Sequence, residues 1–179
     1  MIALIVGDFC VGKDLVANLL LKKSLQHHDC EKFEKIKSYT TREPRYEGED
    51  THIFCTMDDY YNYSNIFNAG CIVAETQINN NYYFTIESQF DPNKVSLYVV
   101  DDKGIQDVVG AEIDDVYIIE VVRPVWLRDC PKERLNRDRQ SQPYEYKFDY
   151  RIINDGSMEK LEASVLECFN ALLKVKKSL

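Results

Sequence analysis

The sequence predicts an α/β fold in which helices cover the faces of a central parallel sheet. Short apolar runs with the character of strands alternate with segments of helical periodicity, a pattern typical of this architecture. A glycine-containing turn joins the first strand directly to the first helix. The alternation breaks between residues 40 and 90, where the chain becomes polar, irregular and rich in tyrosine. Together these observations predict a three-layer core that carries one inserted subdomain.

Five apolar runs are candidates for the strands of the core sheet. They cover residues 2–6, 35–39, 96–100, 116–122 and 150–153. The last run ends at Asn154-Asp155-Gly156, and Ser157 then offers the side-chain oxygen of a helix N-cap. Apolar residues that recur at helical spacing predict a final helix, namely Leu161, Val165, Cys168, Phe169, Leu172 and Leu173.

Residues 39–90 are interpreted as an insertion in one domain that spans residues 1–179. Residues 1–38 and 91–179 would then form the core. Within the insertion we expect a helix near residues 57–67, because acidic residues at its start favour the positive end of the helix dipole. We also expect a hairpin across residues 71–84, with its turn supplied by Asn79-Asn80-Asn81.

Composition limits the classes of protein and partner. The chain has 179 residues, of which 45% are hydrophobic, so one sizeable core is expected. No apolar run approaches the length of a membrane span. The first strand occupies the start of the chain, so we expect neither a signal peptide nor a membrane partner. The formal net charge of -8 argues against nucleic acid as a main partner.

The cysteines indicate a reducing compartment. Six of them are scattered along the chain, at positions 10, 30, 55, 71, 130 and 168. They form no C-x-x-C pair and have no histidine at the spacing of metal ligands. This distribution argues against a zinc site and against a disulfide framework, and it predicts a cytoplasmic protein.

The first candidate site is the turn Gly7-Asp8-Phe9-Cys10-Val11-Gly12-Lys13-Asp14. It fits the phosphate-binding pattern G-x-x-x-x-G-K-[ST] at every position but the last. Glycines let backbone N–H groups turn inward around a phosphate, and the lysine reaches the outer phosphates. The helix that follows adds the positive end of its dipole. The motif therefore predicts a phosphate-binding turn, or P-loop, and the alternative from these residues alone is a strand-to-helix turn without a ligand.

The second candidate site is the loop Ser38-Tyr39-Thr40-Thr41-Arg42-Glu43-Pro44-Arg45. Its two arginines stand three residues apart, beside several hydroxyl groups. A guanidinium fork can hold a phosphate at two points, and hydroxyls complete the coordination. The same pattern also suits a solvated basic turn, so both interpretations are open from these residues alone.

Further segments complete a family pattern. Glu75 precedes Asn81-Tyr82-Tyr83-Phe84-Thr85, Asp101-Asp102-Lys103-Gly104 follows the third core strand, and Phe148-Asp149-Tyr150-Arg151-Ile152-Ile153-Asn154-Asp155 covers the last. With the P-loop and the arginine loop, these segments resemble the guanylate kinase family of nucleoside monophosphate kinases. The resemblance extends over essentially the whole chain. It implies ATP as co-substrate, Mg²⁺ as cofactor and GMP or dGMP as acceptor.

The resemblance also implies roles for single residues. Residues 7–14 would hold the ATP phosphates, and Asn154 would lie near adenine. Residues implied to hold the acceptor nucleotide are Ser38, Arg42, Arg45, His52, Glu75, Tyr83, Thr85 and Asp101. Among these, Glu75 would read guanine with Ser38 and Thr85. Lys13, Arg42, Asp101 and the lid residue Arg134 would be the catalytic set, and Asp14 and Asp101 would meet the metal, Asp14 directly or through water.

Several positions depart from the family pattern. Asp14 replaces a hydroxyl residue, and His52 replaces a tyrosine, with phosphate contact and no role equally open. Phe84 replaces a glycine and would crowd the base pocket. The lid, residues 124–140, is short; Arg128 is the nearby candidate for a lost lid arginine, and Trp126 would pack the lid on the core.

Three alternatives to a guanylate kinase stay open. A sibling branch that phosphorylates ribose 1,5-bisphosphate carries a similar G-K-D in its P-loop. A deoxynucleotide kinase of wider substrate range is a variant of the same chemistry. A binding module could keep the fold and lose catalysis, although it would have no need of the lysine and arginines. The sequence leaves monomer and homodimer equally open.

Overall fold

The computed structural model describes residues 1–27, 32–65, 71–111, 113, 115–132, 135 and 146–177. The chain divides into two compact units. The first comprises Met1–Lys35, Pro92–Asp101 and Asp115–Leu179, and the second comprises Ile36–Asp91 and Asp102–Asp114. Each unit has its own sheet, so each is described by itself.

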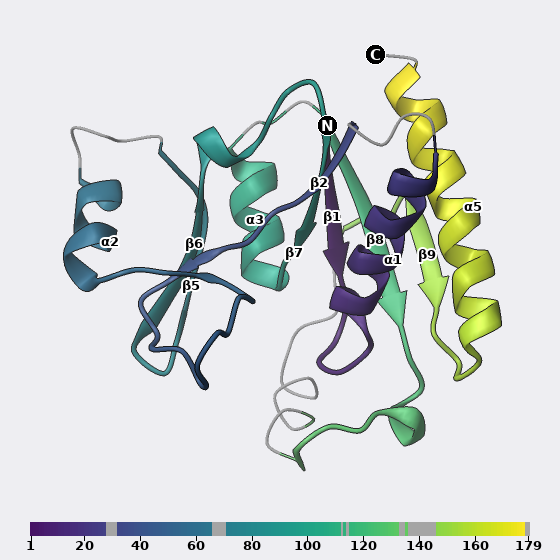
Figure 1. The fold of residues 1–179 in the computed structure, drawn as a ribbon, viewed down its shortest axis with the longest axis horizontal. Helices are drawn as coiled ribbons and strands as arrows, with labels where there is room; N and C mark the ends of the chain where they lie inside the picture. The colour runs from purple at the N-terminus through teal and green to yellow at the C-terminus, as the bar shows by residue number, and fades with distance from the viewer. Residues whose placement is uncertain are drawn as a thin grey trace. The chain divides into compact units, whose positions relative to one another are not determined.

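The first unit is built on a five-stranded sheet that is parallel throughout (Figure 1). In spatial order its strands are β2 (Phe33–Lys35), β7 (Val95–Val99), β1 (Ile2–Val6), β8 (Val116–Val122) and β9 (Tyr150–Ile153). The predicted α/β class, with a central parallel sheet flanked by helices, is confirmed. Because parallel strands end at the same edge, the segments that follow β1, β7, β8 and β9 all start there.

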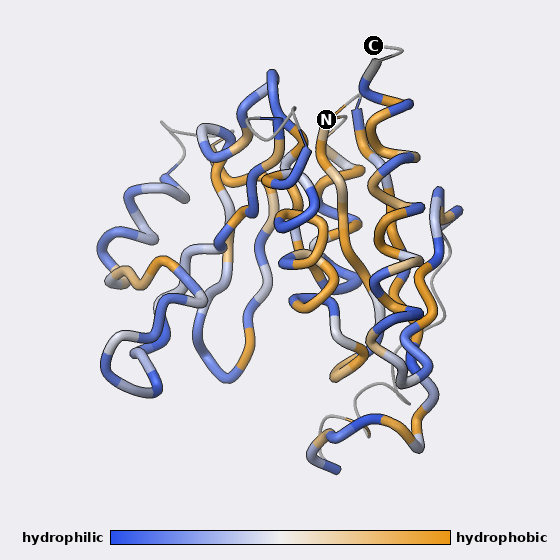
Figure 2. Tube along the Cα trace, turned by 45° about the vertical axis from the view of Figure 1, so that its right-hand side comes forward, coloured by the Kyte–Doolittle hydropathy of each residue, from blue (hydrophilic) through white to orange (hydrophobic). Residues whose placement is uncertain are grey.

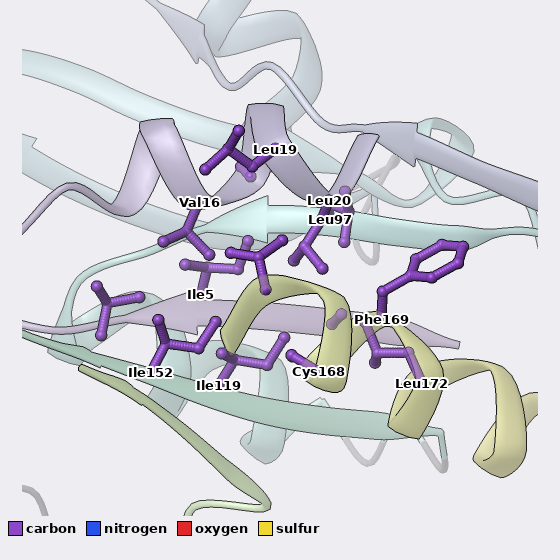
Figure 3. Close-up of a cluster of buried hydrophobic side chains, with 14 of the residues drawn as sticks. Ile5, Val16, Leu19, Leu20, Leu97, Ile119, Ile152, Cys168, Phe169 and Leu172 are labelled. Carbon is purple, nitrogen blue, oxygen red and sulfur yellow. The ribbon is translucent and has the colours of Figure 1, made fainter. Parts of the chain in front are cut away.

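Two helices, α1 (Lys13–Gln26) and α5 (Met158–Lys177), pack with this sheet in one hydrophobic cluster. Figure 3 shows Val16 and Leu20 of α1 directed toward the strand residues, and Leu19 belongs to the same cluster. Ile5, Leu97, Ile119 and Ile152 supply the sheet side of the cluster. Complete burial of one such side chain contributes about 1.5–3 kcal/mol. This cluster therefore fixes the helix that begins at the P-loop.

Strand β1 is apolar on both of its faces. Ala3 and Ile5 belong to the cluster with the helices, whereas Ile2, Leu4 and Val6 point the other way and are buried as well. Such continuous apolar runs are typical of parallel strands. In Figure 2 the chain that follows the N-terminus is accordingly orange, while the helix that leads to the C-terminus alternates between orange and blue.

The second unit holds a mixed four-stranded sheet. Its spatial order is β4 (Ile53–Phe54), β3 (Tyr39–Thr40), β6 (Asn81–Ile86) and β5 (Ile72–Ile78). Helices α2 (Met57–Ser64) and α3 (Asp102–Gly110) and the 3₁₀ turn η3 (Glu87–Gln89) complete it, and α3 packs along β5. Antiparallel pairing of β5 with β6 confirms the predicted hairpin. Asn79 and Asn80, both at positive φ, form its turn, and Asn81 already belongs to β6.

The predicted strand at residues 35–39 is wrong as one element. Lys35 ends β2 in the first unit, whereas Tyr39 begins β3 in the second. The apolar pattern could not separate them because both short strands bury side chains. The predicted helix near residues 57–67 is confirmed up to Ser64, and its last two residues lie outside the described part. Helix α2 begins with a capping box between Thr56 and Asp59.

Other expectations concern membranes and cysteines. Within the described residues, no helix combines the length and the apolar character that crossing a membrane requires. The described cysteines are free thiols, namely Cys10, Cys55, Cys71, Cys130 and Cys168. Burial raises the pKa of the Cys168 thiol to about 12, so this cysteine behaves as a core residue.

Candidate functional site

The turn between β1 and α1 has the backbone that the motif predicts. Gly7 and Gly12 have φ of 140° and 98°, and Cys10 between them has φ of 60°. A Cβ on Gly7 would lie 2.3 Å from the carbonyl oxygen of Val121, and one on Gly12 would lie 2.7 Å from Asn154 Nδ2. Both glycines are therefore required by close approach as well as by φ.

Lys13 folds back over this turn. Its Nζ donates hydrogen bonds to the carbonyl oxygens of Gly7 at 2.7 Å and of Asp8 at 2.8 Å. The same ammonium group lies 5.8 Å from the centre of the Phe9 ring. Helix α1 begins at this lysine, so the first helical N–H groups and the ammonium charge occur together. The arrangement can receive an anion such as a phosphate.

Asn154 holds the turn from the other side. This residue follows β9 and is only 4% exposed. Its Nδ2 donates to the carbonyl oxygen of Val11 at 2.8 Å, and its backbone N–H donates to Val122. Asn154 thus links three segments at the carboxyl edge of the sheet. Its role near adenine stays a prediction.

Both acidic residues of the turn are in ion pairs. Asp8 accepts from a guanidinium nitrogen of Arg128 at 2.7 Å. Asp14 accepts from Lys35 Nζ at 3.0 Å, and the same lysine also donates to Asn18. The side chain of Asp14 is largely exposed, whereas that of Arg128 is almost fully buried. Asp14, which replaces the usual hydroxyl, is thus paired with a cation.

Arg128 lies in a turn after β8 that is held together by side-chain hydrogen bonds. Its Nε donates to the carbonyl oxygen of Arg123, and the Nε of Arg123 donates to that of Leu127. Between them lies the 3₁₀ turn η4 (Val125–Leu127). The expectation that Trp126 packs the lid on the core is wrong, because this side chain is 84% exposed. The turn is held by polar contacts and does not depend on the tryptophan.

The arginine loop of the second unit is organised by Glu49. Two nitrogens of Arg42 donate to the two carboxylate oxygens of Glu49, at 3.2 and 2.8 Å. The carboxylate also accepts from the backbone N–H of Arg45 and the hydroxyl of Thr51. The hydrogen bond from Arg42, aided by the other two, lowers the pKa of Glu49 to about 2. Glu49 is therefore ionised at neutral pH and fixes the guanidinium plane.

Arg42 lies on the sheet surface beside Tyr83 and His52. Its guanidinium carbon is 5.3 Å from the centre of the Phe54 ring. Hydrogen bonding to Glu49 and then to Tyr83 raises the pKa of Arg42. The rings of His52 and Tyr83 meet edge to face at 5.4 Å. Among the described residues, Arg42 Nε is buried with no hydrogen-bond partner. The predicted residues Arg42, His52 and Tyr83 are thus brought together.

The pairing of the strands assigns these residues to one face of the sheet. Tyr83 is directly opposite Thr40, and Thr40 is beside Phe54, so their side chains share that face. We call it the arginine face. Thr85, two residues after Tyr83, lies on it as well and is fully buried. Its cross-strand neighbour on β5 is Ala74.

Glu75 lies on the opposite face. It pairs with Phe84, which alternates with Tyr83 and Thr85. Its Oε2 accepts a hydrogen bond from the hydroxyl of Tyr60 at 2.9 Å, and Tyr60 belongs to the core cluster of Phe84. Burial, with this hydrogen bond, raises the pKa of the Tyr60 hydroxyl. The structure therefore does not bring Glu75 together with Thr85 at one base, because the pairing of β5 with β6 puts their side chains on opposite faces of the sheet.

Phe84 is a core residue. It is fully buried and lies against the rings of Tyr39, Tyr60 and Tyr63. The expected crowding of a base pocket by this ring does not arise on the arginine face. There, β6 presents Tyr83 and Thr85 instead. The aromatic side chain in place of glycine has a packing role beneath α2.

The remaining predicted residues are placed as follows. Ser38 is half-buried, and its carbonyl accepts from the N–H of Ile53. The side chain of Arg45 is exposed, and so is that of Asp101, just after β7. Arg134 lies outside the described residues. Within the described part of the chain, no group of three or more His, Cys, Asp or Glu residues could hold a metal ion.

Three ion pairs were not predicted from the sequence. Glu49 follows Arg42 by seven residues, and an acid so close to two arginines was a readable signal of an internal ion pair. Lys35 is 21 residues from Asp14 and carries no motif, so nothing in the sequence indicated that pair. Arg128 was a candidate only for a lid role, and its pairing with Asp8 was not predicted.

Comparisons with known proteins support the fold. No protein-family model matches the chain, and no curated protein matches it. A guanylate kinase from Anaplasma phagocytophilum is similar in structure, with a TM-score of 0.65 and 21% sequence identity. The match covers 97% of this chain and 85% of that one. At this identity the match establishes a guanylate-kinase-like fold.

Proposed function

We propose that this chain is an ATP-dependent nucleoside monophosphate kinase, with GMP or dGMP as the first acceptors to test. The observation that carries the proposal is the turn between β1 and α1. Its glycines allow backbone that other residues cannot adopt, and its lysine is folded over the same turn. A packed core has no need of such a turn, whereas a triphosphate requires inward N–H groups and a mobile cation.

The arginine face supports a second phosphate site. Arg42 is held by Glu49 and lies beside Tyr83, and its Nε is buried with no hydrogen-bond partner among the described residues. A phosphate oxygen could accept from Arg42 and Tyr83 without any movement of Glu49. Transfer between two phosphates needs positioning and positive charge more than covalent catalysis. Lys13 and Arg42 would supply that charge, and the assignments of Arg45 and Arg134 belong to the same proposal.

A magnesium ion fits the donors that the P-loop offers. Mg²⁺ prefers oxygen ligands and is usually held by one or two carboxylates together with substrate phosphates. Asp14 would hold it, directly or through water, with Lys35 moving from one carboxylate oxygen, and Asp101 is the second candidate. Bound there, the ion would neutralise charge on the phosphates. The ion and Lys35 would then compete for the carboxylate of Asp14.

The experiment is a coupled assay of ADP release with a panel of acceptors. GMP, dGMP, dTMP and ribose 1,5-bisphosphate are compared with ATP and magnesium present. We expect turnover with a guanine nucleotide and its loss in Lys13→Ala. Lys147→Ala removes an exposed lysine that is remote from both motifs in the sequence. It is the matched control and should keep full activity. Absence of ADP with every acceptor would refute the proposal and favour a binding module.

One observation favours a second candidate, a kinase with ribose 1,5-bisphosphate or another phosphorylated acceptor. Glu75, the residue expected to read guanine, lies on the opposite face from Tyr83 and Thr85. Without a carboxylate on the arginine face of β5, guanine loses its distinguishing contact. Turnover with ribose 1,5-bisphosphate or dTMP at a rate equal to that with GMP would decide for this candidate.

A further inference from the structure

The charges of the P-loop lead to an inference that rests on the proposed function. Residues 7–14 contain two carboxylates, Asp8 and Asp14, and one ammonium group, Lys13. A loop that receives a polyphosphate therefore has a net negative charge of its own. Like charges at such short range repel each other, so binding depends on cations from outside the loop.

Each carboxylate has such a cation, but the two pairs differ in burial. The side chain of Arg128 is 6% exposed, and its guanidinium lies 2.7 Å from Asp8. In the second pair the side chain of Asp14 is 76% exposed, with Lys35 at 3.0 Å. Solvent and salt screen the second pair more strongly than the first. The buried pair is therefore the one with the larger effect on a bound anion.

Asp8 also stands next to the lysine of the loop. Its backbone carbonyl accepts from Lys13 Nζ at 2.8 Å, while its side chain is directed to Arg128. Without the arginine, the Asp8 carboxylate would have no cation of its own and would be free to turn toward the ammonium group that already donates to the Asp8 backbone. A lysine held by that carboxylate would be less available to a phosphate.

Arg128 is itself held in place. Its Nε donates to the carbonyl oxygen of Arg123, and Arg123 in turn is bonded to Leu127. The guanidinium is therefore fixed at the carbonyl of Arg123 and at the carboxylate of Asp8. This double attachment suits a residue that holds a carboxylate aside and does not suit one that swings to a substrate.

We propose that Arg128 is a positioning residue of the P-loop, which neutralises Asp8 so that Lys13 and the loop N–H groups can bind the polyphosphate chain of a nucleoside triphosphate. Arg128 acts through Asp8 and makes no contact with the phosphates. The role differs from that of a lid arginine, which would touch the transferring group.

A double-mutant cycle tests this proposal. Binding of inorganic tripolyphosphate and of ATP to the full chain is measured by calorimetry for the wild type, Arg128→Met, Asp8→Asn and the double variant. We expect Arg128→Met to bind both ligands at least tenfold more weakly, because Asp8 is left uncompensated. The double variant should return to within about threefold of the wild type, because the carboxylate is gone as well.

Two further variants separate charge from structure. Arg128→Lys keeps the positive charge and should lose less affinity than Arg128→Met. Arg151→Met removes an arginine that pairs with Glu120 on the strands β9 and β8, and it should bind like the wild type. A melting curve for each variant reports folding. A purely structural Arg128 would lower the melting temperature of the single and double variants alike and leave the affinity of the folded protein unchanged.

The outcomes are distinct. A double variant as weak as Arg128→Met would mean that the arginine touches phosphate itself, and this would overturn the proposal. Equal affinity of Arg128→Met and the wild type would also overturn it, with the kinase proposal intact. If the wild type bound neither ligand, the kinase proposal would fail first and this one with it. Should Arg128→Met not fold, the double variant still decides. Affinity within about threefold of Asp8→Asn and of the wild type would support the proposal, and a much weaker affinity would overturn it.

Discussion

At the scale of residues, the second unit depends on one buried carboxylate. Glu49 binds the guanidinium of Arg42 at two points and also accepts from Arg45 and Thr51. These donors favour the ionised form, which explains why the pKa of Glu49 falls from 4.5 to about 2. Because the arginine is oriented in advance, a phosphate on the arginine face would meet a donor that has already lost its rotational freedom.

The shifted pKa predicts a dependence of stability on pH. A carboxyl whose pKa is lower in the folded state stabilises the protein above its unfolded pKa, and the contribution disappears as pH falls through the folded value. The stability due to Glu49 should therefore be complete above about pH 5 and lost toward pH 2. Urea unfolding of the wild type and Glu49→Gln between pH 2.5 and 7 should show a difference that shrinks with acid. A difference independent of pH would contradict this.

Gly7 makes a second prediction at this scale. Its φ of 140° and the carbonyl of Val121, 2.3 Å from an added Cβ, leave no room for a side chain. Gly7→Ala should lower the free energy of unfolding by roughly 2 kcal/mol or more and weaken ATP binding. Gly110→Ala is the matched control, because an added Cβ there meets nothing within 4 Å. Equal stability of the two variants would show that the turn tolerates a side chain.

Among the elements, α2 shows how local chemistry sets where a helix begins. The helix has only eight residues and contributes Tyr60 to the core of the second unit. So short a helix is unstable alone, and its cap and its packing must both contribute. Thr56 accepts from the N–H of Asp59, and the Asp59 carboxylate accepts from the N–H of Thr56.

The capping box predicts a measurable loss. Thr56→Ala should destabilise the protein by about 1 kcal/mol, because one helical N–H loses its partner. Ser64→Ala removes a hydroxyl from the other end of the same helix, where it makes only a 3.4 Å bond to Tyr61, and should change little. Chemical denaturation of both variants provides the comparison. A loss in Ser64→Ala as large as that in Thr56→Ala would argue against a specific cap.

The strands show which elements could be predicted from the sequence alone. Strands β1, β8 and β9 were predicted with the bounds that they have, because each is an apolar run closed by polar or turn residues. The run at residues 35–39 failed because periodicity does not say to which sheet a residue belongs. The face of Glu75 was also beyond prediction. It depends on the pairing of β5 with β6, in which one residue more or less reverses every side chain.

At the scale of the whole molecule, the chain combines two units, each with one candidate phosphate site. Motifs singled out Lys13 and Arg42 as candidate phosphate contacts, because glycine turns and paired arginines are visible in a sequence. Their ionic partners were harder to predict, since Asp8 and Arg128 are 120 residues apart. Only a folded chain reveals such pairs. We therefore propose that the donor and acceptor phosphates bind to different units, and each binding step can be tested separately.

Steady-state kinetics of two variants can show whether the donor and acceptor phosphates bind to different units. ADP release is measured with ATP and the best acceptor varied in turn, for the wild type, Lys13→Ala and Arg42→Gln. We predict that Arg42→Gln raises the KM for the acceptor at least tenfold with the KM for ATP unchanged, and that Lys13→Ala lowers kcat at least a hundredfold. A wild type that releases no ADP with any phosphorylated acceptor, or an Arg42→Gln variant with unchanged acceptor KM, would contradict the account.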